Sequence, residues 1–79
     1  MITIYGSENC IWCLRAKQLA ETFELEHEYK SVELYQAEFS SKFPTARTVP
    51  QIEWGNTYIG GYEMFAKAVN EFINNGENK

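Results

Sequence analysis

The spacing of hydrophobic and polar residues changes along the first third of the chain. Residues 2–5 alternate, with Ile2 and Ile4 on one side, and predict a short strand that ends at Gly6. Residues 11–24 contain neither Gly nor Pro, and their apolar positions recur at the spacing of one helix face. The pattern therefore predicts a strand followed by an amphipathic helix. The apolar positions of that helix are Ala16, Leu19, Ala20 and Phe23.

The middle of the chain predicts a second strand and a second, shorter helix. Residues 29–34 alternate between apolar and polar side chains, which indicates a strand. Aromatic residues then recur every four positions, which places them on one face of a short helix that Pro44 ends. We expect this aromatic face to belong to the hydrophobic core. Its members are Tyr35, Phe39 and Phe43.

The last third of the chain predicts a hairpin and a closing helix. Two short alternating runs, 51–54 and 57–59, are joined by a Gly-Asn pair that favours a tight turn. Residues 62–73 follow the i, i+3, i+4, i+7 spacing of a helix, for which Gly76 is the expected C-cap. The order β-α-β-α-β-β-α predicts an α/β fold with helices packed on the faces of one sheet.

Length and composition restrict the class of protein. A chain of 79 residues predicts a single domain, residues 1–79, and its 44% hydrophobic and 15% aromatic content argues against disorder. The net charge of −4 and seven scattered cations provide no basic stripe for nucleic acid. The sequence has no apolar run long enough to cross a bilayer and no signal-peptide pattern at its start. We therefore expect a cytoplasmic monomer without a membrane or nucleic-acid partner.

The two cysteines, Cys10 and Cys13, are the strongest candidates for chemistry. They stand where the first strand turns into the first helix, so their spacing places both sulfurs on one side of the helix start. Cys10 then lies beside unpaired backbone N–H groups and the positive end of the helix dipole, which favour a nucleophilic thiolate. Cys13 lies one turn inside the helix. We therefore predict that Cys10 attacks a disulfide and that Cys13 resolves the product.

Other uses of the two cysteines remain open at the level of the residues. A zinc site would need four ligands, and the further candidates are one histidine, His27, and carboxylates. A structural disulfide is a second possibility, although closing so short a loop constrains the unfolded chain little. Two inert core cysteines are a third possibility. We predict no metal site.

Four segments make the sequence resemble the glutaredoxin family, from about residue 2 to residue 72. Each segment alone is a weak signal, but their order and spacing together are specific. They are the Cys-x-x-Cys pair after the first strand, Leu14-Arg15-Ala16-Lys17, Thr48-Val49-Pro50-Gln51-Ile52 and Ile59-Gly60-Gly61-Tyr62.

The resemblance implies a thioredoxin-like α/β/α sandwich with a four-stranded mixed sheet and three helices. From the residues alone, Pro50 is either a simple loop proline or part of a cis peptide bond. The resemblance implies that the Val49–Pro50 bond is cis and that it lies beside the cysteines.

The resemblance also implies a groove for glutathione. Thr48 and Val49, beside Pro50, would pair with the backbone of glutathione like an added strand. Trp12, which stands where relatives commonly have Tyr, would flank the cysteine of glutathione, and Arg47 would hold its glycine carboxylate.

A turn at the start of the last helix would complete this groove. By similarity, backbone N–H groups there would receive the γ-glutamyl end of glutathione. The residues of the turn are Gly61, Tyr62 and Glu63.

The activity implied by the resemblance is a glutathione-dependent thiol–disulfide oxidoreductase. It would reduce protein disulfides and glutathione mixed disulfides, with ribonucleotide reductase as one protein substrate expected from the family. Glutathione would serve as reductant, and no permanently bound cofactor is expected.

Three departures from the family pattern favour alternative functions. The loop before Cys10 carries Glu8 where many relatives have a cation, and Met64 stands where relatives often have Asp. These two residues favour a redoxin that is reduced by thioredoxin reductase. Ile11 replaces the commoner Pro, which leaves open a binding module that holds an iron–sulfur cluster with glutathione.

Overall fold

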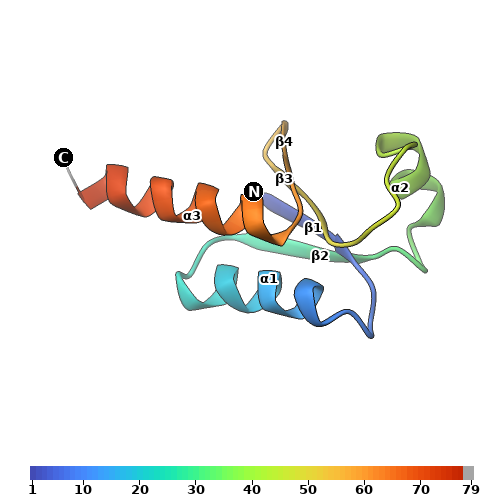
Figure 1. The fold of residues 1–79 in the computed structure, drawn as a ribbon, viewed down its shortest axis with the longest axis horizontal. Coiled ribbons are helices and arrows are strands. Elements are labelled where there is room, and N and C mark those ends of the chain that lie inside the picture. The colour runs from blue at the N-terminus through green and yellow to red at the C-terminus, as the bar shows by residue number, and fades with distance from the viewer. Residues whose placement is uncertain (78–79) are drawn as a thin grey trace.

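The computed structural model describes residues 1–77, which form a four-stranded sheet and three helices (Figure 1). The element order β-α-β-α-β-β-α expected from the sequence is confirmed. In chain order the elements are β1 (Ile2–Gly6), α1 (Ile11–Thr22), β2 (His27–Ser31), α2 (Gln36–Lys42), β3 (Gln51–Trp54), β4 (Thr57–Gly60) and α3 (Tyr62–Glu77).

The sheet is mixed, with the strand order β2-β1-β3-β4. Strand β1 pairs in parallel with β2 and antiparallel with β3, and β3 pairs antiparallel with β4. Within the sheet, Ile4 lies between Tyr29 of β2 and Ile52 of β3. Because β3 runs opposite to β1, the start of β3 lies beside the end of β1, where Tyr5 pairs with Gln51. The predicted α/β class and four-stranded mixed sheet are therefore confirmed.

The main core lies between one face of the sheet and helices α1 and α3. Alternation along β1 turns Ile2 and Ile4 toward this face, and Ala16 and Ala20 of α1 pack over them. Figure 1 shows α1 and α3 close to each other, with α2 standing apart at the other end of the molecule. The other members of this core are Ile52, Phe65 and Val69.

A smaller aromatic cluster covers the opposite face of the sheet. Tyr5 points to this face, and its ring centroid lies 6.0 Å from that of Phe39 and 5.3 Å from that of Phe43. Helix α2 has no fully buried residue, and Tyr35 before it is 42% exposed. The expectation that these aromatic residues belong to the main core therefore needs correction, because Phe39 and Phe43 form a separate, half-buried cluster with Tyr5, and Tyr35 is exposed.

Strand β2 begins and ends earlier than the alternation of residues 29–34 predicts. It pairs with β1 over His27–Ser31, and the backbone then turns. The N–H groups of Leu34 and Tyr35 both donate to the carbonyl oxygen of Ser31, at 3.1 and 2.9 Å. Leu34 is 83% exposed, so its place in the alternating pattern reflects the turn into α2 and not a sheet face.

Two helix ends also differ from the sequence prediction. Helix α1 stops at Thr22, because Glu24 adopts a left-handed conformation with φ of 54° and the next N–H, of Leu25, bonds back to Ala20. Helix α3 continues through Gly76 to Glu77, so Gly76 is not its C-cap. One glycine costs a helix only about 0.5–1 kcal/mol relative to alanine, which is too little to end it.

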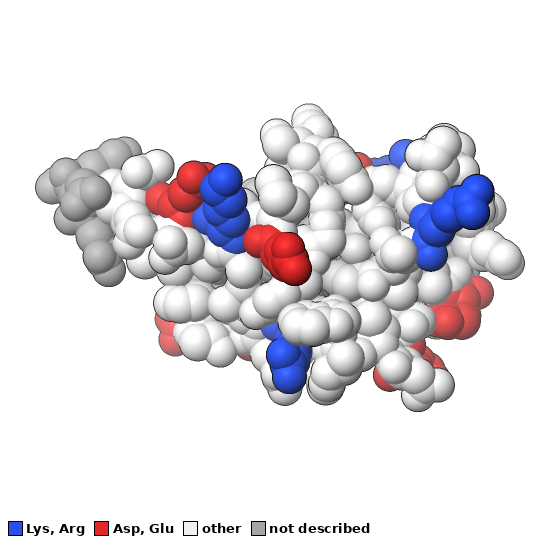
Figure 2. All heavy atoms as spheres, viewed as in Figure 1, with Lys and Arg blue, Asp and Glu red and all other residues white. Residues whose placement is uncertain are grey.

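The surface of the described residues carries scattered charges. On the face drawn in Figure 2, Lys and Arg side chains stand apart from one another, so this face has no continuous basic surface. Within residues 1–77, no helix combines the length and the apolar character that a membrane crossing requires.

Candidate active site around Cys10

Three connections meet at one end of the sheet and form the candidate site. Residues 7–10 follow β1, residues 48–50 precede β3, and residues 61–63 follow β4. Because β3 is antiparallel to both β1 and β4, its first residues lie beside the last residues of both neighbours. The sheet topology therefore brings together three segments that are far apart in the sequence.

Cys10 caps the N-terminus of α1. Its backbone is extended, with φ of −99° and ψ of 112°, and its Sγ accepts the N–H of Cys13 at 3.2 Å. The Cys10 thiol in turn donates to the carbonyl oxygen of Val49 at 3.6 Å. The first turn of α1 contains no acidic residue. The half-buried Cys10 sulfur thus contacts one backbone donor and one carbonyl acceptor and lies at the N-terminal end of α1.

Cys13 has a contrasting environment one turn further along α1. Its side chain is fully buried, and this burial raises the pKa of the thiol to about 12. The hydrogen bond with Cys10 also raises this pKa, whereas the hydrogen bonds with the Ser7 backbone and the Tyr29 hydroxyl lower it. Both cysteines are free thiols. Cys13 is therefore a neutral, buried thiol next to the more accessible thiol of Cys10.

Gly6 makes room for Cys13 at the end of β1. A Cβ atom placed on Gly6 would lie 2.8 Å from Cys13 Cβ and 2.9 Å from Cys13 Sγ, and it would also overlap the hydroxyl of Tyr29. No side chain fits in this space, so the buried sulfur requires glycine at this position. The Tyr29 hydroxyl donates to the carbonyl oxygen of Ser7 at 3.0 Å. Burial, followed by the adjacent Cys13 sulfur, raises the pKa of Tyr29.

The loop of residues 48–50, before β3, lies next to Cys10 through the contact between the Cys10 thiol and the Val49 carbonyl oxygen. The Val49–Pro50 bond is cis, which confirms the expectation drawn from the family resemblance. The side chain of Gln51, only 6% exposed, donates from Nε2 to the carbonyl oxygen of Thr48 at 3.0 Å. This buried amide ties the start of β3 to the loop and holds the Val49 carbonyl near Cys10.

A groove of about 390 Å³ lies beside this loop and contains seven of the eight residues predicted to bind glutathione. Met64, at the family's Asp position, also lines the groove. The exception is Arg47, which lines a neighbouring hollow of about 530 Å³ that shares Thr48 with the groove. The seven residues in the groove are Trp12, Thr48, Val49, Pro50, Gly61, Tyr62 and Glu63.

Trp12 forms one wall of the groove between two neighbouring side chains. Its ring centroid lies 5.3 Å from that of Tyr62, and the guanidinium carbon of Arg15 lies 4.7 Å from the Trp12 ring centroid. Arg15 therefore places a positive charge against the tryptophan ring. These contacts hold the 48%-exposed indole in place.

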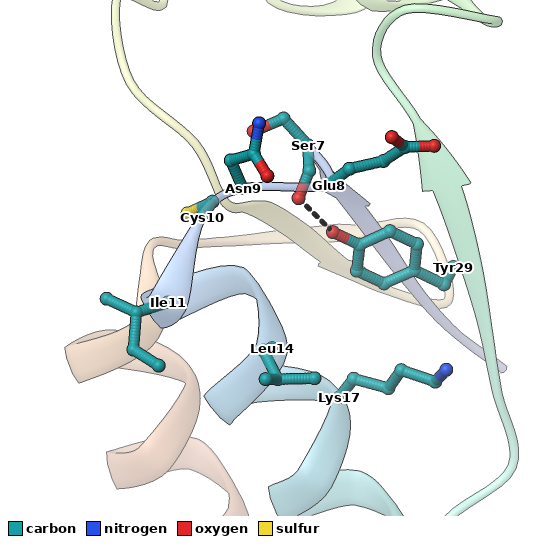
Figure 3. Close-up of a pocket in the computed structure, with 8 residues that line it drawn as sticks. All are labelled: Ser7, Glu8, Asn9, Cys10, Ile11, Leu14, Lys17 and Tyr29. Carbon is teal, nitrogen blue, oxygen red and sulfur yellow. Dashed lines mark hydrogen bonds between the residues drawn. The ribbon is translucent and has the colours of Figure 1, made fainter.

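A second pocket, of about 410 Å³, opens on the α1–β2 side of Cys10 (Figure 3). We call it the Tyr29 pocket. Its upper edge is the loop of residues 7–9, and the side chain of Leu14 projects into it from α1. In Figure 3, Cys10 and Ile11 lie at one end, and Glu8, Tyr29 and Lys17 lie at the other.

Comparison with known proteins places the chain in a family. The glutaredoxin family model matches residues 2–59. The chain belongs to the glutaredoxin family. It is therefore a thiol–disulfide oxidoreductase with a thioredoxin-like fold, and Cys10 and Cys13 are its redox-active pair.

Curated relatives agree with this assignment. Glutaredoxin 1 of Escherichia coli strain K12 is 37% identical over 78 residues, which cover 86% of this chain and 91% of the relative. The mitochondrial glutaredoxin-2 of Bos taurus is 36% identical over 67 residues. That alignment covers 76% of this chain, and the chain spans only 41% of the length of the bovine protein.

Solved structures show the same fold. Reduced glutaredoxin of Escherichia coli matches with a TM-score of 0.77 and 30% identity, over 92% of this chain and 96% of that one. The glutaredoxin-like NrdH-redoxin of Escherichia coli, described as having a thioredoxin-like activity profile, matches with a TM-score of 0.67. Its identity is 23%, over 84% of this chain and 91% of that one, so this match supports the fold alone.

Three residues of this glutaredoxin site are not predicted by the sequence patterns. The pattern places Tyr29 only in a strand, because nothing local shows that β2 neighbours β1 beside the cysteines. It places Gly6 only at a strand end, whereas the lack of a side chain on Gly6 accommodates Cys13. Arg15 could have been found, since residues three apart on a helix lie on one face and it follows Trp12 by three.

His27 lies away from the cysteines. It pairs with Ile2 at the first residue of β1, whereas Cys10 and Cys13 follow the last residue of that strand. Its ring Nδ1–H donates to the carbonyl oxygen of Leu25 at 2.8 Å. Within the described residues, no three His, Cys, Asp or Glu side chains cluster as metal ligands.

Proposed function

We propose that this glutaredoxin uses glutathione to reduce protein disulfides and glutathione mixed disulfides. The observation that supports this proposal is the groove beside the Val49–Pro50 loop, which opens next to the accessible Cys10 sulfur. Three separate segments line it, and they are the segments to which the family resemblance assigns glutathione contacts. Disulfide-bearing proteins are the expected substrate class, with ribonucleotide reductase as the member that the family suggests.

The proposed cycle begins with attack by Cys10. Its thiolate bonds to one sulfur of the substrate disulfide, and the other sulfur leaves with the electron pair and takes a proton from solvent. With a protein substrate, Cys13 then attacks Cys10, forms the Cys10–Cys13 disulfide and releases the second substrate thiol. Two molecules of glutathione reduce that disulfide and leave as oxidised glutathione.

Glutathione would bind along the groove in a single orientation. Its cysteine would sit beside Trp12, with backbone pairing to Thr48 and Val49 as in an added strand. Its γ-glutamyl end would meet the N–H groups at the start of α3, which opens at Tyr62. Arg47 would have to reach across from the neighbouring hollow to hold the glycine carboxylate.

Two observations favour a second candidate function, a redoxin that is reduced by thioredoxin reductase. Glu8, an acid in the loop before Cys10, opposes the approach of anionic glutathione. Met64 supplies an apolar side chain to the groove at a position where relatives often provide a carboxylate. Both candidate functions use the same thiol–disulfide exchange at Cys10 and Cys13.

The experiment that tests the proposal is a choice between electron donors. Reduction of the mixed disulfide between cysteine and glutathione would be followed with glutathione plus glutathione reductase, or with thioredoxin reductase alone. Turnover only with glutathione supports the proposal, and turnover only with thioredoxin reductase replaces it with the second candidate. The Cys13→Ser variant should keep activity on this small mixed disulfide but lose reduction of protein disulfides, and retention of both would contradict the resolving role.

A further inference from the structure

The Tyr29 pocket adjoins Cys10 on the side away from the groove. Cys10 itself lines this pocket, and its sulfur also contacts Val49, which lines the groove. The two hollows are of similar size, about 410 and 390 Å³. Cys10 therefore lies between two binding surfaces, and the proposed function uses only one of them.

A tripeptide and a polypeptide differ in what they require beside the reacting sulfur. Glutathione has one residue on each side of its cysteine, and the proposed groove receives both. A polypeptide continues past its cysteine in both directions, and each further residue adds about 3.3–3.6 Å of extended chain. A residue next to the attacked cysteine of a polypeptide can thus enter the Tyr29 pocket.

The lining of the pocket favours a long side chain with an apolar stem. Ile11 and Leu14 are 55% and 47% exposed, although both are large aliphatic residues. Together with the ring of Tyr29 they provide apolar surface along the pocket. Lysine and arginine bury their methylene stems on such surfaces while their charged ends stay in water.

The charges of the pocket favour a cation at the end of that side chain. Glu8 is exposed, and within residues 1–77 its carboxylate makes no hydrogen bond or ion pair. The ammonium of Lys17 is the opposing charge, and it lies 5.9 Å from the centroid of the Tyr29 ring. When Cys10 attacks as a thiolate, two negative groups and one positive group line the pocket, so a bound cation is preferred.

We propose that the Tyr29 pocket binds a lysine or arginine side chain of disulfide-bearing polypeptide substrates, next to the cysteine that Cys10 attacks. Glu8 is then a specificity-determining residue, and the pocket is a polypeptide subsite that glutathione does not use. This inference rests on the proposed role of Cys10 as the nucleophile.

Short peptides with one activated cysteine test the proposal directly. The probes are Ala-Ala-X-Cys-X-Ala-Ala peptides, with Lys, Gln or Glu at X, whose cysteine forms a mixed disulfide with thionitrobenzoate. Attack by Cys10 on the peptide sulfur forms the Cys10–peptide disulfide and releases coloured thionitrobenzoate with the electron pair. The Cys13→Ser chain keeps the product covalent, and each rate is divided by the rate of the same peptide with dithiothreitol.

We expect the lysine peptide to react roughly two- to fivefold faster than the glutamine peptide, and the glutamate peptide to be slowest. Glu8→Gln should remove most of this preference, whereas Lys17→Gln should increase it. The matched control Glu21→Gln removes one exposed carboxylate at the far end of α1 and should leave the preference unchanged. Salt at about 1 M should suppress the effect in every variant.

Two results would overturn the inference. One is equal rates for the three peptides, and the other is an equal loss of preference in Glu8→Gln and Glu21→Gln, which would indicate an effect of net charge only. In both cases the glutamine peptide still reacts, so Cys10 remains the nucleophile. Absence of reaction with every peptide would instead contradict the proposed function itself.

Discussion

At the scale of single residues, the two cysteines differ more than their spacing suggests. Cys10 is half exposed and receives a backbone N–H, whereas Cys13 is fully buried against Gly6. Burial penalises a thiolate because a charged sulfur loses its hydration, so the pKa of Cys13 rises to about 12. One sulfur is therefore ready to react with substrate, and the other is held as a neutral thiol.

The raised pKa of Cys13 predicts how its alkylation depends on pH. In the Cys10→Ser variant, the rate of reaction with iodoacetamide should rise about tenfold per pH unit from about pH 7 to about pH 11, because only the thiolate reacts. The rate should not level off in that range, since the pKa of about 12 lies above it. Mass spectrometry of timed samples gives the rates. A plateau near pH 9 would show that burial does not hold the proton on Cys13.

At the scale of elements, the local pattern predicts the centres of helices and strands better than their ends. The apolar spacing of α1 continues past Thr22, but the chain leaves the helix there through Glu24. A left-handed conformation is costly for any residue with a Cβ atom, and glycine avoids that cost. The end of α1 thus depends on the path of the chain into β2, which the local spacing of apolar residues does not predict.

Glu24→Gly should therefore stabilise the protein. We expect the free energy of unfolding to increase by about 0.5–1 kcal/mol, because glycine relieves the left-handed backbone but also loosens the unfolded chain. Urea denaturation of the reduced protein measures the change. Gln18→Gly, at an exposed position inside α1, should instead destabilise by about 1 kcal/mol. Equal effects of the two substitutions would contradict the backbone explanation.

Helix α2 and helix α3 should contribute unequally to stability. Phe65 of α3 is fully buried, so Phe65→Ala should cost about 3–5 kcal/mol in the free energy of unfolding. Phe43, after α2, is half-buried, and Phe43→Ala should cost only about 1–2 kcal/mol. Urea denaturation checks both values, and Phe65→Leu provides the comparison if Phe65→Ala does not fold. A cost for Phe43→Ala that equals that of Phe65 would place α2 in the main core.

At the scale of the whole molecule, the sheet topology assembles the site. The loops before β3 and after β4 both reach the end of β1 because β3 runs opposite to its two neighbours. The groove is therefore made of three segments, of which Trp12 lies 36 positions before Thr48 and Pro50 lies 11 positions before Gly61, while Cys10 and Cys13 come from a single turn. The Tyr29 pocket depends in the same way on the parallel pairing of β2 with β1.

This assembly predicts where bound glutathione would be detected. In the Cys13→Ser variant carrying glutathione on Cys10, amide NMR signals of Thr48, Val49, Gly61 and Tyr62 should shift, together with the indole N–H of Trp12. The same variant carrying a methylthio group on Cys10 serves as the control, since it has the disulfide but no peptide. Shifts confined to Glu8 and Tyr29 would place glutathione in the Tyr29 pocket and overturn the proposed use of the groove.

Local patterns in the sequence are enough to predict the order of the elements and the dithiol at the start of α1, because both depend on neighbours within a few residues. The family resemblance further indicated the cis Val49–Pro50 bond and seven residues that line the groove. The folded chain alone shows that Tyr29 and Gly6 surround Cys13, that Arg47 lies outside the groove, and that a second pocket adjoins Cys10. Strand pairing and close packing join residues that are distant in sequence, and the local spacing of apolar residues does not depend on those contacts.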